Sequence, residues 1–288
     1  MPDLAVALAV WYRGNARDLP WRRPGFGAWG VLVSEVMLQQ TPVNRVVRHL
    51  ELWLERWPTP VALASATPAE VLGQWANLGY PRRALWLHRA AVEISERHGG
   101  VVPRDVDALL ALSGVGDYTA RAVAVFAYGE RHPVVDTNTR RVLARAVAGR
   151  SQPGPPSRRD LAVMAAFLPE DPALATVVNA ATMELGATTC VARTPRCGEC
   201  PIREECAWRR AGYPDTGDAR RRQQTYEGSD RQARGAVLRV LRESAGHAAE
   251  LAGVLPDWPD AAQRQRAMAS LVADGLAVRS ETTLSLPH

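Results

Sequence analysis

Apolar residues recur at helical spacing through most of the chain, which predicts a protein built mainly from α-helices. Leu4, Leu8 and Trp11 share one helical face, and Thr41-Pro42 divides a long apolar stretch into two helices. Strand signals are nearly absent up to residue 225. The predicted helices lie within residues 1–19, 29–57, 59–98, 105–128, 158–168 and 172–187.

A glycine turn, SGVG at residues 113–116, interrupts the pattern between a helix that ends near Leu112 and one that begins at Asp117. The glycines permit a sharp turn and leave the first amides of the second helix open to an anion. The pattern indicates a phosphate-binding hairpin. A simple turn between helices is the alternative.

Two carboxylic acids occupy positions suited to acid–base chemistry. Asp136 directly precedes a predicted helix soon after the hairpin, although an Asp there is also typical of a helix N-cap. Glu35 lies in an apolar helix between Val33 and Val36. Burial there would raise its pKa and keep it as a neutral general acid, whereas a solvated helix face would not.

The loop NLGYPRR at residues 77–83 connects two predicted helices within residues 59–98. An aromatic ring beside two arginines suits nucleic acid, because the ring can stack and the guanidinium groups can neutralise phosphates. An ordinary helix connection with a charged rim would look the same.

All four cysteines fall within seventeen residues, in the spacing C-x6-C-x2-C-x5-C, and no export signal precedes them. Disulfides are therefore a poor explanation, and a metal site fits better. Structural zinc more often uses two C-x-x-C pairs, so the uneven spacing favours an iron-sulfur cluster over zinc.

The 288 residues carry a formal net charge of +5, which fits a polyanionic partner. All 35 basic residues are arginine, and genome composition explains that bias. Whatever its cause, no side-chain amine can form a Schiff base with an abasic sugar. Neither a membrane span nor a signal peptide is visible, so we expect a cytoplasmic, nucleoid-associated protein.

Taken together, these motifs resemble those of the helix-hairpin-helix Gly-Pro-Asp superfamily of DNA glycosylases, and within it the MutY-type adenine DNA glycosylases. The resemblance covers residues 5–225. Its most discriminating segment is SEVMLQQT at residues 34–41. The other matching segments are LPWR at 19–22, LGY at 78–80, GVGDYTA at 114–120, VDTN at 135–138 and MELGATTC at 183–190.

The resemblance implies a role for each matching residue. Glu35 would protonate N7 of a flipped adenine and then handle the attacking water, while Asp136 would stabilise the oxocarbenium ion beside Asn138. Tyr118 stands where bifunctional relatives carry a lysine nucleophile, which implies monofunctional chemistry. The implied adenine pocket comprises Trp21, Arg22 and Glu184. The implied DNA contacts are Gln40, Thr41, Leu78, Tyr80, Gly114, Val115, Gly116 and Arg121. The implied [4Fe-4S] ligands are Cys190, Cys197, Cys200 and Cys206.

Two residues depart from the family pattern: Pro81 replaces a frequent second Tyr, and Arg121 replaces a frequent Gly. The former could reshape the wedge that enters the duplex, and the latter could add a phosphate contact. The tail also differs, because family members typically continue into a Nudix-like domain that reads 8-oxoguanine. A shorter tail could relax the discrimination between 8-oxoguanine and guanine opposite adenine.

The expected fold is mainly α: a helix-hairpin-helix glycosylase of two helical lobes with a small winged-helix-like α+β C-terminal module. The six-helix lobe would span residues 26–132, and the cluster lobe residues 1–25 and 133–228, with Glu35 and Asp136 in the cleft between them. The module would span 229–288, with a short helix at 247–254 and a terminal hairpin.

The expected function is base-excision repair, in which the protein, as a monomer, removes adenine opposite 8-oxoguanine or guanine in double-stranded DNA. Two alternatives remain open. One is a thymine-mismatch or oxidised-pyrimidine glycosylase on the same scaffold. The other is a non-catalytic iron-sulfur DNA-binding regulator, which would need neither Glu35 nor Asp136.

The absence of lysine generates a first prediction. Incubation with a lesion duplex should release the base and leave the abasic strand intact, and the strand should break only after alkali treatment, because no side-chain amine is present to start β-elimination. Denaturing electrophoresis with and without alkali measures both steps. Strand breakage at the enzyme's own rate without alkali would contradict monofunctional chemistry.

Overall fold

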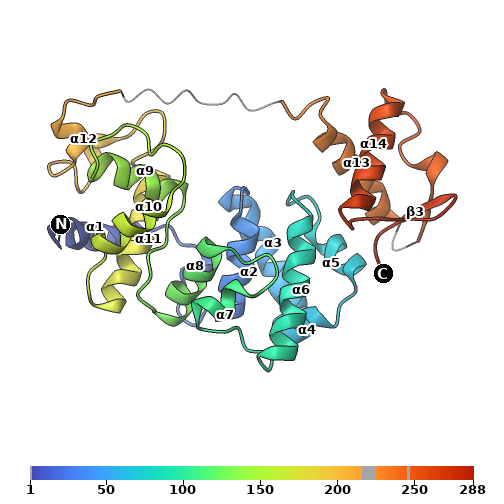
Figure 1. Ribbon diagram of the computed structural model, residues 1–288, viewed down its shortest axis with the longest axis horizontal. Coiled ribbons are helices and arrows are strands. Elements are labelled where there is room, and N and C mark those ends of the chain that lie inside the picture. Colours follow the sequence, from blue (N-terminus) through green and yellow to red (C-terminus); the bar gives the residue numbers. More distant parts are fainter. Residues whose placement is uncertain (1, 216–224, 245–246) are drawn as a thin grey trace. The chain divides into compact units, whose positions relative to one another are not determined.

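A computed structural model describes residues 2–215, 225–244 and 247–288 (Figure 1). This part of the chain is helical except for a three-stranded sheet near the C-terminus, as the apolar periodicity predicts. None of its helices combines the length and apolar character that a bilayer crossing needs. The sequence predicts a linker at residues 212–228 that contains an arginine run at residues 220–222, and this run lies outside the described residues.

The chain forms two compact units. The first comprises Met1–Val31, Arg104–Leu110 and Gly116–Arg220, and the second Leu32–Pro103, Ala111–Val115 and Arg221–His288. Each unit is therefore assembled from segments that are distant in sequence. The lobe boundaries expected from sequence differ from these, notably around the hairpin, and they stay a prediction.

The first unit is built around α1, α9 and α11, which lie side by side (Figure 1). Their apolar faces contribute Leu8, Val142, Val178 and Leu185 to a core that Met164 of the following helix α10 completes. Its elements are α1 (Pro2–Asn15), η1 (Pro20–Arg22), α7 (Val106–Leu110), α8 (Asp117–Tyr128), α9 (Thr137–Ala146), α10 (Arg158–Phe167), α11 (Pro172–Thr188), η2 (Cys197–Glu199) and α12 (Ala207–Arg210).

The second unit begins within α2, and three tryptophans mark its core. Trp53 is fully buried and meets Trp57 and Trp75 edge to face, with ring centroids 4.8 and 5.5 Å apart. Such pairs stabilise beyond the area they bury. The helices are α2 (Ala28–Leu38), α3 (Val43–Arg56), α4 (Pro60–Ala64), α5 (Pro68–Trp75) and α6 (Arg82–Arg97).

The expectation of only two helices within residues 59–98 is wrong, because α4 and α5 both precede the loop and α6 follows it. The cause is local. Thr67 begins α5 with a capping box to Glu70, and Pro68 takes the first helical position. A proline there favours a new helix and disfavours continuation of the old one.

The C-terminal module has the order helix, strand, helix, strand, strand, which agrees with the predicted winged-helix-like fold. Its elements are α13 (Asp230–Glu243), β1 (Ala249–Glu250), η3 (Leu251–Gly253), α14 (Ala261–Ala273), β2 (Val278–Arg279) and β3 (Thr283–Ser285). The strands pair antiparallel in the order β1-β3-β2, with Ala249 opposite Leu284 and Val278 opposite Ser285. The short helix expected at 247–254 is wrong, since β1 joins the sheet there and only η3 is helical.

Candidate active site and cysteine loop

Glu35 lies in the last two turns of α2 and is buried, with 5% of its surface exposed. Its neighbours Ser34, Val36 and Met37 are buried as well. The apolar pattern of this helix therefore predicts the burial of the carboxyl group correctly, and the alternative of a solvated face is wrong. A buried carboxyl group is the environment that a general acid requires.

Asp136 lies directly before α9, and both of its carboxylate oxygens accept hydrogen bonds. Oδ1 accepts from the amide of Thr139 at 2.7 Å, which makes Asp136 the N-cap of α9. Oδ2 accepts from Nδ2 of Asn138 at 2.8 Å. Asp136 is thus an N-cap, as one reading of the sequence expected, and the same bonds hold its carboxylate in one orientation.

The N-terminus of α9 rests directly on α11 at Gly186. A Cβ at position 186 would lie 2.7 Å from Cβ of Asn138 and 2.8 Å from its carbonyl oxygen. These distances are too short for any side chain, so a glycine is required for the two helices to approach. The orientation of Asn138, and through it that of Asp136, depends on this contact.

Arg141 joins α9 to the start of the cysteine loop. Its guanidinium donates to Oδ1 of Asn138 at 2.8 Å, to the carbonyl of Gly186 at 2.5 Å and to the carbonyl of Cys190 at 2.7 Å. A chain of hydrogen bonds therefore runs from Asp136 through Asn138 and Arg141 to Cys190. Arg140 bonds Asp160 at 2.8 Å, so both arginines serve packing within the unit.

The four cysteines line one cavity, together with Arg145 and Trp208. In the described part of the chain, no three Cys, His, Asp or Glu side chains converge on a single metal ion. Thiols spread around one cavity suit a cluster of several irons, in which each iron takes its own thiolate. Burial, together with the neighbouring thiols, raises the pKa of the Cys200 thiol to about 11, and metal binding is what converts such a thiol into a thiolate.

Arg145 holds this loop from beneath. It is buried, its Nη1 lies 3.4 Å from Sγ of Cys190, and it donates to the carbonyls of Val191 and Ala192 at 2.8 and 3.1 Å. Its guanidinium also lies over the ring of Trp208 at 4.8 Å. The first cysteine of the loop is therefore positioned by the helix that Asp136 caps.

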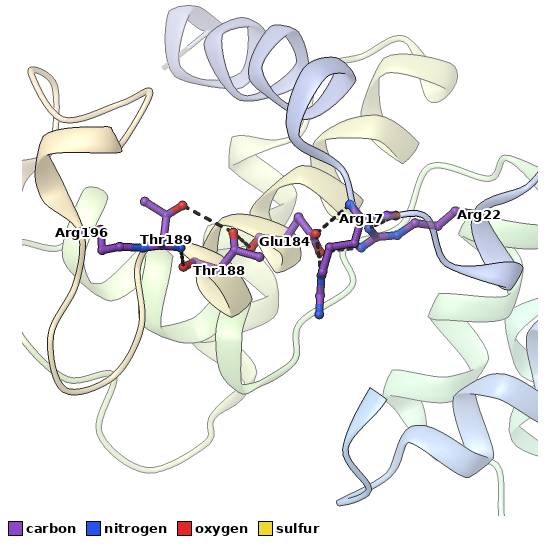
Figure 2. A network of polar contacts seen from close by, with 6 residues as sticks. All are labelled: Arg17, Arg22, Glu184, Thr188, Thr189 and Arg196. Atoms are coloured by element: carbon purple, nitrogen blue, oxygen red, sulfur yellow. Dashed lines mark hydrogen bonds and ion pairs between the residues drawn. The ribbon is translucent and has the colours of Figure 1, made fainter. Parts of the chain in front are cut away.

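Glu184 on α11 is fully buried and receives two arginines (Figure 2). Arg17 donates to Oε1 at 2.7 Å and to Oε2 at 2.8 Å, and Arg22 donates to Oε2 at 2.8 Å. Burial alone would raise the pKa of Glu184, but these hydrogen bonds outweigh it and lower the pKa to about 2. The end of α11 thus carries Glu184 and Gly186 and leads into the cysteine loop.

Farther along this network, Thr188 donates to the carbonyl of Glu184 at 2.8 Å, and Arg196 of the cysteine loop donates to the carbonyl of Thr188 (Figure 2).

Trp21 lies in η1 beside Arg22 and is half-buried. Tyr118 on α8 is also half-buried and packs against the small core of Ala122, Val125 and Val134.

The hairpin turn follows the geometry that its glycines predict. Gly114 has a φ of +76°, and a Cβ there would lie 2.5 Å from Cβ of Trp86. Glu93 holds the turn by accepting hydrogen bonds from the amide and hydroxyl of Ser113 at 2.7 and 2.8 Å. Gly116 is exposed and Val115 is buried. Arg121 pairs with Asp117 at 3.0 Å, so its guanidinium already has an acidic partner.

Of the DNA contacts expected at residues 40–41 and in the loop at residues 77–83, only some are exposed. The Tyr80 side chain is 46% exposed and Gln40 is exposed, and both have positive φ angles, of 47° and 56°. Thr41 is buried and donates to the carbonyl of Leu78 at 3.3 Å. The Leu78 side chain is only 2% exposed, so it packs inside the unit.

Sequence reasoning missed Arg17, Arg141 and Arg145 as parts of the site. Arg141 and Arg145 are four residues apart and follow Asn138 by one and two turns, so they share a face of α9 with it. That spacing could have indicated a common inward direction. Nothing local points from Arg17 to Glu184, 167 residues away.

Two family models match the chain. The HhH-GPD superfamily of base excision DNA repair proteins matches residues 33–163, and the iron-sulfur binding domain of endonuclease III matches residues 190–206. The second match covers all four cysteines, which agrees with the cavity that they line.

Whole-chain comparisons agree with these matches. The chain is 56% identical to the adenine DNA glycosylase of Mycolicibacterium smegmatis, over 94% of this chain and 91% of that protein. It is 54% identical to that of Mycobacterium tuberculosis, over 95% and 90%. The structure of a thermostable thymine-DNA glycosylase shares the fold, with a TM-score of 0.67 and 24% identity over 73% of this chain and 96% of that one.

The contact at Gly186 generates a prediction. Gly186→Ala should lower the rate constant of the reaction at the candidate site on the order of 10²-fold, because the added Cβ must push Asn138 and the N-terminus of α9 away. Single-turnover base excision measures the effect. Gly73→Ala on α5, where an added Cβ meets no atom within 4 Å, is the matched control and should retain the wild-type rate. Equal rates for both variants would contradict the positional role.

The ion pairs of Glu184 generate a dependence of stability on pH. Folding lowers the pKa of Glu184 from about 4.5 to about 2. The contribution of this carboxylate to the free energy of unfolding is therefore complete above about pH 4.5 and is lost as the pH falls toward 2. Glu184→Gln should remove a contribution of about 2 kcal/mol at pH 7, discounted for the half-exposed Arg17.

Denaturant unfolding of both proteins between pH 3 and 7 tests this expectation. Both proteins carry the same cysteine loop, so its own acid sensitivity cancels in the difference. The difference in free energy of unfolding between the wild type and Glu184→Gln should decrease on acidification. A difference that stays constant with pH would refute the stabilising role of the Glu184 ion pairs.

Proposed function

The chain belongs to the adenine DNA glycosylases of the HhH-GPD superfamily, and we propose that it removes adenine mispaired with 8-oxoguanine or guanine from double-stranded DNA. The contrast between its two carboxyl groups carries this proposal. Glu35 is buried in the apolar helix α2, whereas Asp136 is half-buried and both of its oxygens accept hydrogen bonds. Hydrolysis of an adenine glycoside needs one carboxyl group as an acid and one as a negative charge.

Glu35 would donate its proton to N7 of the flipped adenine. The C1′–N9 bond then breaks with its electron pair passing to the base, and positive charge develops on the sugar. Asp136 would stabilise that charge, because Asn138 and the Thr139 amide hold its carboxylate in place. Water would add to C1′ and return a proton to Glu35. Tyr118 offers no amine, which supports attack by water.

The adenine would bind beside Trp21, Arg22 and Glu184. The Glu184 carboxylate fixes the Arg22 guanidinium through a 2.8 Å bond, and Arg17 adds a second cation to the same carboxylate. Such a network presents donors in fixed directions, which is what recognition of a flipped base needs. Arg17 therefore joins the proposed pocket as a residue that orients Glu184.

The hairpin at residues 113–116 would grip the DNA backbone, because the exposed Gly116 directly precedes α8 and leaves the first amides of that helix open to an anion. Tyr80 and Gln40 would contact the duplex, since both are exposed and both lie in turns with a positive φ angle. Thr41 and Leu78 would support them from below. Arg121 is paired with Asp117, so it could contact a phosphate only if this ion pair breaks.

The [4Fe-4S] cluster belongs to the loop at residues 190–206. Cys190, Cys197, Cys200 and Cys206 would hold it, and when bound it supplies structural order to the loop. Arg196 and Arg203 line the same cavity, but each has a glutamate partner in the loop, so a phosphate contact by either would compete with that pair. Arg141 and Arg145 tie this loop to the helix that Asp136 caps.

A panel of duplexes tests the proposed function. Cluster-loaded protein should release adenine from duplexes with A opposite 8-oxoguanine and A opposite G, and should leave thymine opposite G intact. Glu35→Gln and Asp136→Asn should each reduce single-turnover excision by about 10³-fold or more while duplex binding stays within a few fold, because each removes a charge or proton of the chemical step.

Three results would count against this assignment. Intact A opposite 8-oxoguanine after prolonged incubation would refute the activity, and release of thymine would favour the related mismatch enzymes. Retained turnover in both variants would refute the two roles. Iron content and helical circular dichroism confirm that each protein compared is loaded and folded.

A further inference from the structure

Arg83 is a buried cation with neutral partners only. It lies in the first turn of α6 with 4% of its surface exposed. Among the described residues, no carboxylate pairs with it. Burial lowers the pKa of its guanidinium to about 10, which leaves it charged at neutral pH. A buried charge is costly, so its partners identify what it does.

One side of the guanidinium binds the end of the helix that carries Glu35. Nη1 donates to the carbonyl of Val36 at 2.8 Å and to that of Met37 at 3.0 Å. These residues directly follow Glu35 in the last turn of α2, where carbonyls lack helical partners and carry the negative end of the helix dipole. Arg83 therefore caps α2 immediately after the proposed acid.

The other side of the guanidinium binds the two turns that carry the proposed duplex contacts Gln40 and Tyr80. Nη2 donates to Oγ1 of Thr41 at 2.9 Å and to the carbonyl of Gly79 at 3.0 Å. The guanidinium also lies 5.4 Å from the ring of Tyr80 and 5.2 Å from that of Trp75. Trp75 in turn donates to the Gly79 carbonyl at 2.9 Å, so several bonds hold one turn of the loop.

The backbone around these contacts is strained. Gln40, Gly79 and Tyr80 all have positive φ, and the two that are not glycine persist only if their surroundings hold them. The bonds of Arg83 fall beside each of them. The guanidinium fork thus fastens two strained turns to the end of α2.

We propose that Arg83 is a positioning residue that couples the turns at Gln40–Thr41 and Gly79–Tyr80, which would enter the duplex, to the end of the helix that places Glu35. The inference rests on the proposed function. Lysine cannot substitute, because one ammonium group cannot reach acceptors on both sides in the planar geometry of the fork. Loss of the fork would leave the acid helix and the duplex contacts free to shift separately.

The test compares Arg83→Lys with Arg89→Lys, which makes the same change at an exposed position of α6. Arg83→Lys should lower single-turnover excision from A opposite 8-oxoguanine on the order of 10²-fold. It should also weaken the fluorescence rise of 2-aminopurine placed next to the target adenine, which reports unstacking by the entering turns. Arg89→Lys should match the wild type in both measurements.

A second variant guards against misfolding and isolates the link. Thr41→Val removes one acceptor of the fork with little change in volume, and it should lower excision and the fluorescence rise in the same direction by about tenfold. The double variant should lose clearly less than the product of the two single losses, because the bond between Arg83 and Thr41 is removed in both single variants, although Thr41→Val also removes the bond to the Leu78 carbonyl. Fully additive losses would overturn the coupling, as would excision by Arg83→Lys within about twofold of the wild type.

The two proposals fail in different ways. If wild-type protein does not excise adenine, the proposed function fails, while the 2-aminopurine signals of the variants still decide the link between Arg83 and the turns. If the wild type excises adenine, Glu35→Gln is inactive and Arg83→Lys retains both the rate and the signal, only the Arg83 inference falls. A loss of excision proportional to a measured unfolded fraction would also overturn it.

Discussion

The close contact of α9 with α11 at Gly186 is the constraint on which the candidate site of the first unit depends. Because position 186 has no side chain, Asn138 can lie against α11 and hold Asp136 from one side. The same approach brings Arg141 within reach of Gly186 and Cys190. The absence of a Cβ at position 186 therefore fixes the relative positions of the Asp136 carboxylate, the Asn138 amide that binds it and the start of the cysteine loop.

Several guanidinium groups join segments that are distant in sequence by binding backbone carbonyls. Arg145 binds the carbonyls of Val191 and Ala192 in the cysteine loop, and Arg83 binds those at the end of α2. A planar fork can satisfy several carbonyls at once in fixed directions, which an ammonium group cannot. The formal net charge of +5 therefore overstates the positive charge on the surface that could meet DNA, because some arginines, such as Arg83 and Arg145, are buried.

Glu184 illustrates how burial and pairing act against each other. Removal of its carboxyl group from water favours the neutral acid, yet two arginines reverse that preference and hold the carboxylate. Glu35 is buried as well, in the apolar helix α2 beside Val36 and Met37. The two glutamates are therefore both removed from water, but only Glu184 is paired with two arginines.

The sequence by itself determined most of the helices, the hairpin turn and the iron-sulfur loop, and it offered the capping role of Asp136 and the burial of Glu35 each as one of two alternatives. Each of these follows from local spacing, such as the period of an apolar face, a glycine at a turn or the interval between cysteines. Only the tertiary structure decided that Leu78 is buried and that Arg17 meets Glu184. It alone joined Arg83 to the carbonyls that follow Glu35. These contacts bring together residues that are tens to more than a hundred positions apart, so their partners depend on how whole helices pack rather than on any local pattern.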